Sequence, residues 1–122
     1  MQFVVVQKQS GVAIGTCLLF HFDEASARAE IGYVLGQRHW GRGYMSEALS
    51  QLFAFAFDDL SLRRLEAEVD SRNVASDRLL LRMGFTKEGM LRQRWVTKGE
   101  VQDANIYGLL RHEWSHSSMK EA

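Results

Sequence analysis

The residues best suited to chemistry lie between Gln37 and Ser46, in the stretch Gln-Arg-His-Trp-Gly-Arg-Gly-Tyr-Met-Ser. Gly41 and Gly43 lack a Cβ, so the backbone can approach a ligand closely at these positions. A strand-like segment enters the stretch and an amphipathic helix leaves it, so backbone N–H groups meet the positive end of a helix dipole. Arg38 and Arg42 add positive charge at the same place. The stretch therefore predicts a site for a phosphate-bearing ligand.

A row of carboxylates forms a second candidate site. Glu66, Glu68 and Asp70 alternate with apolar residues and would share one face of a strand. Such a row could attract a cationic amine. The alternative, which this pattern more often represents, is a solvated face of a sheet.

A third pattern, His112-Glu113-Trp114-Ser115-His116, matches the H-E-x-x-H motif of zinc proteases. That chemistry needs both histidines on one helical face, with the glutamate as the base. Here the motif follows an expected strand near the last residue of the sequence, which leaves little room for an active-site helix and a third ligand. We expect no metal, and a zinc site remains the least favoured alternative.

Two other nucleotide-binding motifs fit the glycine-rich stretch poorly. The dinucleotide fingerprint needs a third glycine where Ser46 stands, and it needs strands that alternate with helices to the end of the fold. A P-loop needs Gly-Lys-Ser/Thr, which the sequence lacks.

The elements that must position these residues follow from hydrophobic periodicity. Apolar residues at spacings of three and four predict a helix over about Tyr44–Phe57. Asn73 can cap a second helix, which Gly84 would end. Strands are expected at Phe3–Val6, Val12–Phe22, Arg28–Leu35, Leu65–Asp70, Phe85–Trp95 and Val101–Leu110, with a turn at Lys98-Gly99 before the last. The order β-β-β-α-β-α-β-β predicts an α+β fold with a mixed sheet.

Composition limits the class of protein. The 122 residues suit one domain over residues 1–122. Lys plus Arg and Asp plus Glu both number 15, which argues against broad nucleic-acid binding. No apolar run approaches the ~20 residues of a membrane span, and no signal peptide is evident. Cys17 is the single cysteine, so no intramolecular disulfide can form; we expect a cytoplasmic protein with neither a nucleic-acid nor a membrane partner.

Cys17 and His21 raise the possibility of a covalent cysteine intermediate. Four residues along a strand span about 13 Å, which is too far for a hydrogen bond between the two side chains. Cys17 is therefore expected to be a packing residue.

Four motifs, in order, resemble the Gcn5-related N-acetyltransferase (GNAT) family, and especially its bacterial branch related to ribosomal-protein-alanine N-acetyltransferases. Arg38-His39-Trp40-Gly41-Arg42-Gly43 fits that family's acetyl-CoA loop, Gln/Arg-x-x-Gly-x-Gly/Ala. The other matches are Glu30-Ile31-Gly32-Tyr33, then Asn73-Val74-Ala75-Ser76 with Gly84-Phe85, and a closing stretch with Leu91–Trp95, Asp103 and Tyr107–Leu110. The resemblance implies a mostly antiparallel sheet with two main helices packed on it.

The resemblance also implies roles for particular residues in transfer of acetyl from acetyl-CoA to a primary amine. The loop amides would hold the CoA pyrophosphate, and the strand before the loop would pair with the pantetheine and polarise the thioester carbonyl. Glu30 would be the general base, and Ser76 would protonate the leaving thiolate. Tyr107 is expected to be a core residue. The residues expected to bind acetyl-CoA are Tyr33, Val34, Leu35, Arg38, His39, Gly41, Arg42, Gly43, Tyr44, Met45 and Asn73.

The sequence departs from the family pattern at its start. Members usually carry a first strand and two helices ahead of the segment that appears here as Phe3–Val6, and those helices form one wall of the acceptor site. The acceptor, a protein N-terminus or a small amine, therefore stays open. A non-catalytic acyl-CoA-binding or dimerisation module is the main alternative. The exposed strand edge at Phe3–Val6 favours a homodimer.

Overall fold

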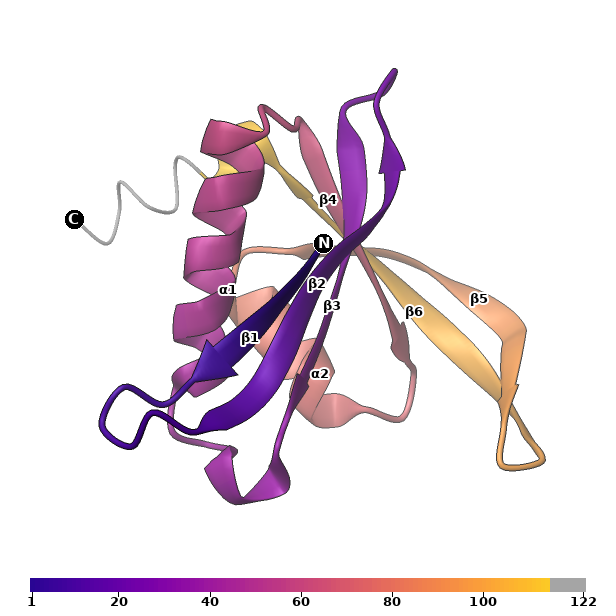
Figure 1. Ribbon diagram of the computed structural model, residues 1–122. Helices are drawn as coiled ribbons and strands as arrows, with labels where there is room; N and C mark the ends of the chain where they lie inside the picture. Colours follow the sequence, from indigo (N-terminus) through magenta and orange to yellow (C-terminus); the bar gives the residue numbers. More distant parts are fainter. Residues whose placement is uncertain (115–122) are drawn as a thin grey trace. The chain divides into compact units, whose positions relative to one another are not determined.

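The computed structural model describes residues 1–114. The chain divides into two compact units, Met1–Arg63 and Arg64–Ala122 (Figure 1). Among the described residues, no helix has the length and apolar character that crossing a membrane requires.

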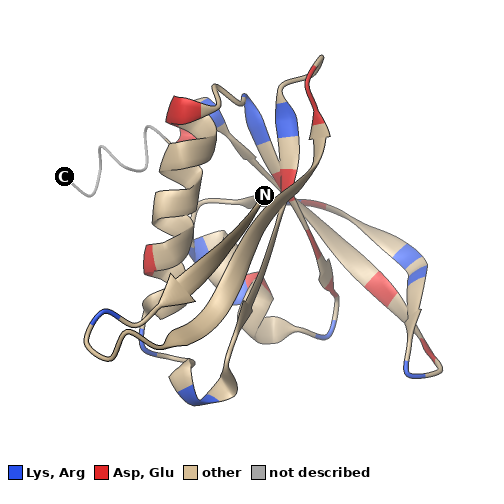
Figure 2. Ribbon diagram, viewed as in Figure 1, with Lys and Arg blue, Asp and Glu red and all other residues tan. Residues whose placement is uncertain are grey.

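The first unit begins with a three-stranded antiparallel sheet. Its strands are β1 (Gln2–Val6), β2 (Ala13–Asp23) and β3 (Arg28–Leu35), and β2 lies between the other two. Apolar residues alternate along β2 and β3, so that one face of the sheet carries the core side chains. Figure 2 shows how little charge β1 and β2 carry: Asp23, at the end of β2, is the single Asp, Glu, Lys or Arg residue of the two strands.

One helix covers this sheet. After a 3-10 turn, η1 (Gln37–His39), α1 runs over Tyr44–Ala54 and lies along the core face of the sheet (Figure 1). Its buried residues, at spacings of three and four, are Met45, Leu49, Leu52 and Phe53. Full burial of one such Leu or Phe side chain contributes about 1.5–3 kcal/mol, so this apolar stripe is what attaches α1 to the strands. Phe3 of β1 adds an edge-to-face contact with Phe55, with ring centroids 5.6 Å apart.

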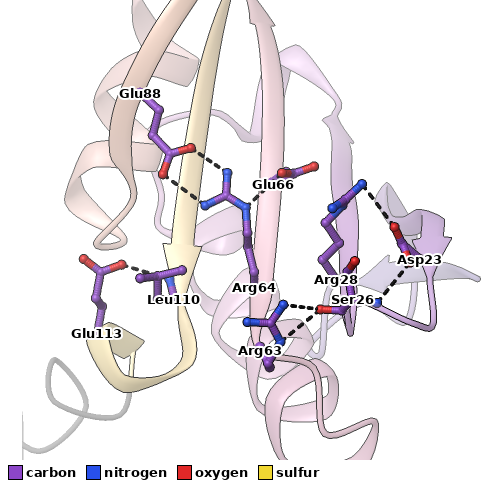
Figure 3. Close-up of polar contacts among 9 residues, drawn as sticks. All are labelled: Asp23, Ser26, Arg28, Arg63, Arg64, Glu66, Glu88, Leu110 and Glu113. Atoms are coloured by element: carbon purple, nitrogen blue, oxygen red, sulfur yellow. Dashed lines mark hydrogen bonds and ion pairs between the residues drawn. The ribbon is translucent and has the colours of Figure 1, made fainter.

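The end of this helix differs from the sequence expectation of a regular helix to about Phe57. The α-helix ends at Ala54 and continues as one π-helical turn, η2 (Phe55–Asp59). The wider turn closes with the N–H of Leu60 donating to the carbonyl of Phe55 at 3.0 Å. Arg63 then ends the unit by donating to the carbonyl of Ser26 at 2.6 and 3.0 Å (Figure 3).

The second unit contains β4 (Arg64–Asp70), α2 (Val74–Arg82), β5 (Thr86–Thr97) and β6 (Glu100–Leu110). β6 lies between β4 and β5 and is antiparallel to both. The expected turn between the last two strands is confirmed, since Lys98 and Gly99 both take positive φ (52° and 77°), as a two-residue hairpin requires. The expected order of strands and helices is confirmed throughout, with ends that differ by at most three residues.

Candidate functional site

The glycine-rich loop joins β3 to the first turn of α1, as the sequence predicts. Gly41 and Gly43 adopt φ of 75° and 79°, and Gly43 is the N-cap of α1. A Cβ at either position would meet no atom within 4 Å, so the need for glycine comes from the left-handed backbone rather than from lack of space. Because Gly43 has no side chain with which to cap the helix, the first-turn N–H groups remain the natural donors for an anion.

The loop is held at both ends by side-chain hydrogen bonds that the sequence analysis did not predict. The indole Nε1 of Trp40 donates to the carbonyl of Leu35 at 2.7 Å. Nε2 of Gln7 donates to the hydroxyl of Tyr44 at 2.8 Å. These contacts fix the loop against the end of β3 and against the β1–β2 hairpin.

Three basic side chains flank the loop. Arg38 and Arg42 are exposed, where their charge can reach a bound phosphate. His39 packs edge-on against the ring of Tyr44 at 6.0 Å. Its Nδ1 is buried and has no hydrogen-bond partner within the part of the chain that the structure describes. An anionic ligand would match this set of donors, so the residues present fit the pyrophosphate of acetyl-CoA.

The strand before the loop is β3, which carries the residues expected to pair with pantetheine. Tyr33, Val34 and Leu35 lie opposite Cys17, Thr16 and Gly15 of β2. Antiparallel pairing turns only alternate backbone groups toward β2. The N–H of Gly36 donates to the carbonyl of Ile14 at 2.9 Å, so Val34, two residues earlier, also turns its backbone groups toward β2, whereas those of Tyr33 and Leu35 point away from it. On that side the carbonyl of Leu35 accepts the Trp40 indole.

Met45 differs from its neighbours in the loop, because its side chain is buried against the sheet. Any contact with the ligand would come from its backbone N–H at the helix start. A cavity of about 410 Å³ also opens between β1 and α1, with Tyr44 and Glu47 in its wall. Its lining contains none of the residues 36–43, so this cavity is separate from the glycine loop.

Glu30 lies in the middle of β3, and the structure pairs it with a residue that the sequence interpretation had considered only beside Cys17. Nδ1 of His21 lies 3.2 Å from Oε1 of Glu30. The sequence offered one signal for this contact: a hairpin between the two expected strands would place β2 beside β3. Cys17 itself is buried, and burial raises the pKa of its thiol, in keeping with a packing residue.

In the second unit, Asn73 and Ser76 meet at the start of α2. Oδ1 of Asn73 accepts the backbone N–H of Ser76 at 3.0 Å, so the expected helix cap is confirmed. The cap uses the amide oxygen and leaves the NH₂ group as the part of Asn73 suited to a ligand carbonyl. Tyr107 is fully buried and its hydroxyl donates to Asp77, which confirms the expected core position.

Each carboxylate of the row on β4 forms an ion pair with an arginine. Neither interpretation of the row, as an amine-binding site or as a solvated face, predicted these ion pairs. Glu66 pairs with Arg64, whose guanidinium also contacts Glu88 (Figure 3). Glu68 pairs with Arg94 at 2.7 Å. Further along, Asp70 pairs with Arg72, and hydrogen bonds from the Arg72 backbone N–H and guanidinium hold the pKa of Asp70 below its ordinary value. Each carboxylate of the row is thus neutralised within its own unit.

The H-E-x-x-H pattern is only partly visible. Glu113 accepts the backbone N–H of Leu110 at 2.9 Å (Figure 3). His116 lies outside the described residues. Within residues 1–114, no group of three or more His, Cys, Asp or Glu side chains is placed to hold a metal.

The chain belongs to the GNAT acetyltransferase family, because residues 1–86 match the family model described as an acetyltransferase (GNAT) domain. It is 40% identical over 114 residues to the uncharacterized N-acetyltransferase p20 of Bacillus licheniformis. The match covers 93% of this chain and 64% of p20. It is 33% identical over 94 residues to the ribosomal-protein-serine acetyltransferase of Escherichia coli, covering 77% of this chain and 52% of that protein.

A solved structure shows the same fold. A mutant form of the spermidine N-acetyltransferase SpeG from Vibrio cholerae superposes with a TM-score of 0.89 at 24% identity, covering 96% of this chain and 69% of that one. The α+β fold class expected from the motifs is therefore confirmed. The chain spans between about half and two thirds of the length of the two curated relatives named above.

Proposed function

We propose that this chain transfers an acetyl group from acetyl-CoA to a primary amine by direct attack of the amine on the thioester. The glycine loop carries this proposal. Its two left-handed glycines, the start of α1 and the flanking Arg38 and Arg42 form a donor set suited to a pyrophosphate. GNAT membership supports acetyl-CoA as the co-substrate that brings this pyrophosphate.

We propose the following roles for the remaining residues. Backbone groups of Tyr33 and Leu35 would pair with the pantetheine arm, and an N–H there would stabilise the developing oxyanion. Asn73 would donate its NH₂ group to the arm. Ser76, in the first turn of α2, would return a proton to the leaving thiolate. Glu30 would help remove a proton from the amine.

Two classes of acceptor deserve testing, because similar proteins are named for them. The superposed structure is a spermidine N-acetyltransferase, and one relative is a ribosomal-protein-serine acetyltransferase. We propose a primary amine of one of these classes, either a polyamine or a protein N-terminus. We further propose that the protein acts in the cytoplasm as a homodimer, without a metal.

The first experiment is a calorimetric titration of acetyl-CoA into metal-free protein, with NAD as the control ligand. Micromolar binding of acetyl-CoA without NAD binding would support the loop assignment. Turnover would then be measured with spermidine and with a peptide that begins with serine. Binding without turnover of either amine would favour a non-catalytic acyl-CoA-binding module, and absence of binding would contradict the proposal.

A further inference from the structure

β2 contains a bulge at His21. Two residues of β2, His21 and Phe22, oppose a single residue of β3, Ala29. His21 takes φ of 51°, which is the left-handed conformation that glycine usually supplies in a bulge of this kind. A histidine therefore occupies a position where its Cβ costs stability, and such outliers concentrate at functional sites.

The bulge directs the imidazole toward Glu30. Nδ1 of His21 lies 3.2 Å from Oε1 of Glu30, and the imidazole packs edge-on against Phe20 with centroids 4.6 Å apart. The His21 side chain is 74% exposed, whereas that of Glu30 is only 20% exposed. The carboxylate thus sits back in the sheet while the imidazole reaches into solvent.

The pair lies on the face of the sheet opposite α1. Glu30 alternates along β3 with Ala29 and Ile31, which are both buried in the core. The same alternation places Glu30 and Val34 on one face, so the pair and part of the expected pantetheine-binding stretch share a face of one strand. Asp23 and Arg28, which close the same hairpin, form an ion pair with each other at 3.2 Å, so their opposite charges largely cancel.

We propose that His21 and Glu30 form a dyad that takes the proton from the acceptor amine, an inference that rests on the proposed function. A carboxylate can only accept a hydrogen bond, so the contact places the imidazole proton on Nδ1. Nε2 then carries the lone pair, on a side chain that is 74% exposed. Glu30 positions the imidazole and stabilises its protonated form, and His21 receives the proton.

The step balances as follows for an acceptor R–NH₃⁺. One proton passes from nitrogen to Nε2 of His21, and the neutral amine forms the N–C bond to the acetyl carbon. The C–S bond breaks and sulfur leaves as a thiolate. The second proton lost from nitrogen neutralises that thiolate, so the products are the acetamide and free CoA, and His21 later releases its proton to water.

The test exploits the bulge, because glycine fits its conformation better than histidine does. His21→Gly should unfold at the same temperature as the wild type or higher and should bind acetyl-CoA unchanged. Its kcat for spermidine or the serine peptide should fall by about 10²-fold. Added imidazole should restore turnover. His21→Asn, which tolerates the left-handed backbone but lacks the base, should be equally slow and should serve as the matched control.

A second acceptor distinguishes a loss of proton removal from a misplacement of the acceptor in the site. Hydroxylamine is uncharged at neutral pH and needs no base, so His21→Gly should acetylate it at close to the wild-type rate. Glu30→Gln alone should slow acetylation of the cationic amine. Added to His21→Gly, it should cause no further loss of rate, because the two residues act as a unit.

Three results would overturn the dyad: wild-type turnover by His21→Gly, failure of imidazole to restore activity, or an equal loss with hydroxylamine. A wild type that binds acetyl-CoA but acetylates no amine would instead contradict the proposed function itself.

Discussion

The guanidinium of Arg64 and the carboxylate of Glu88 join β4 to β5 across the backbone of Gly108 in the strand between them. Nη2 to Oε1 measures 2.5 Å and Nη1 to Oε2 measures 3.0 Å. A Cβ on Gly108 would lie 2.5 Å from Oε2 of Glu88 and 2.6 Å from Nη1 of Arg64. The pair therefore has its geometry because residue 108 carries no side chain.

Gly108→Ala should push the two side chains apart without unfolding the sheet. The clashing atoms are the ends of flexible side chains, and a partly exposed pair contributes at most about 1 kcal/mol. Alanine returns about 0.5–1 kcal/mol as the better strand residue. The net change in the free energy of unfolding should stay below about 1 kcal/mol.

A double-mutant cycle in urea isolates the pair itself. Arg64→Met and Glu88→Gln should show coupling in the wild-type background and none in Gly108→Ala. Equal coupling in both backgrounds would show that Gly108 does not control the contact.

The same pair should make stability depend on acidity. Hydrogen bonds from Arg64, helped by its positive charge, hold the pKa of Glu88 below its ordinary value. The folded chain thus binds fewer protons than the unfolded chain in acid. The stabilisation is complete above the ordinary glutamate pKa of about 4.3 and is lost as the pH falls through the lower, folded-state value. Glu88→Gln and Arg64→Met should each flatten the acid limb of a stability–pH curve. An unchanged limb in either variant would refute this account.

Gly43→Asp should abolish acetyl-CoA binding by placing a carboxylate where the pyrophosphate must lie. The matched control is Gly43→Asn, which has nearly the same shape, tolerates the left-handed backbone and carries no charge. Both variants should lose up to about 1–2 kcal/mol of stability, so calorimetry can compare their affinities directly. Full affinity in Gly43→Asp would show that phosphate does not bind at this loop.

Substitutions of Asn73 should separate its cap from its contact with the ligand. Asn73→Ala should lose about 1 kcal/mol of stability together with acetyl-CoA affinity. Asn73→Asp keeps the capping oxygen but replaces the NH₂ group, so it should keep stability and still bind acetyl-CoA weakly. If Asn73→Asp bound acetyl-CoA as tightly as the wild type, the amide would have only a capping role.

Val4→Lys should convert the proposed dimer to a monomer. Val4 lies in the edge strand β1 and is 59% exposed, and a lysine on an edge strand opposes pairing with another chain. Val12→Lys is the control, because Val12 is 57% exposed but precedes β2 in a loop. Sedimentation velocity should show the change in Val4→Lys alone. A wild type that sediments as a monomer would remove the dimer from the proposal.

Local patterns were sufficient for the order of elements and for the loop. Alternation in residues 65–70 and the cap at Asn73 depend on neighbours within a few positions, so the sequence reveals them. The role of Gly41 and Gly43 could be predicted in the same way, because it depends on their own backbone conformation.

Features that depend on register could not be predicted in the same way. The pairing of Glu68 with Arg94 joins residues 26 positions apart in sequence, and it needs the alignment of β4 and β5 through β6, the strand between them. The contact of His21 with Glu30 needs a bulge, which a single extra residue in β2 creates. The π-helical turn after Ala54 was not predicted either, because helical spacing of apolar residues does not distinguish a π-helical turn from an α-helical one.

The hydrogen bond from Trp40 to Leu35 gives the loop an optical reporter of its own. The indole is 59% exposed at the loop, yet its N–H is held on the last residue of β3. A ligand that engages the end of this strand and the start of α1 must alter the polarity around that indole. Emission from Trp40 can therefore follow loading of the loop in real time, with Trp95 and Trp114 replaced by phenylalanine so that one fluorophore remains.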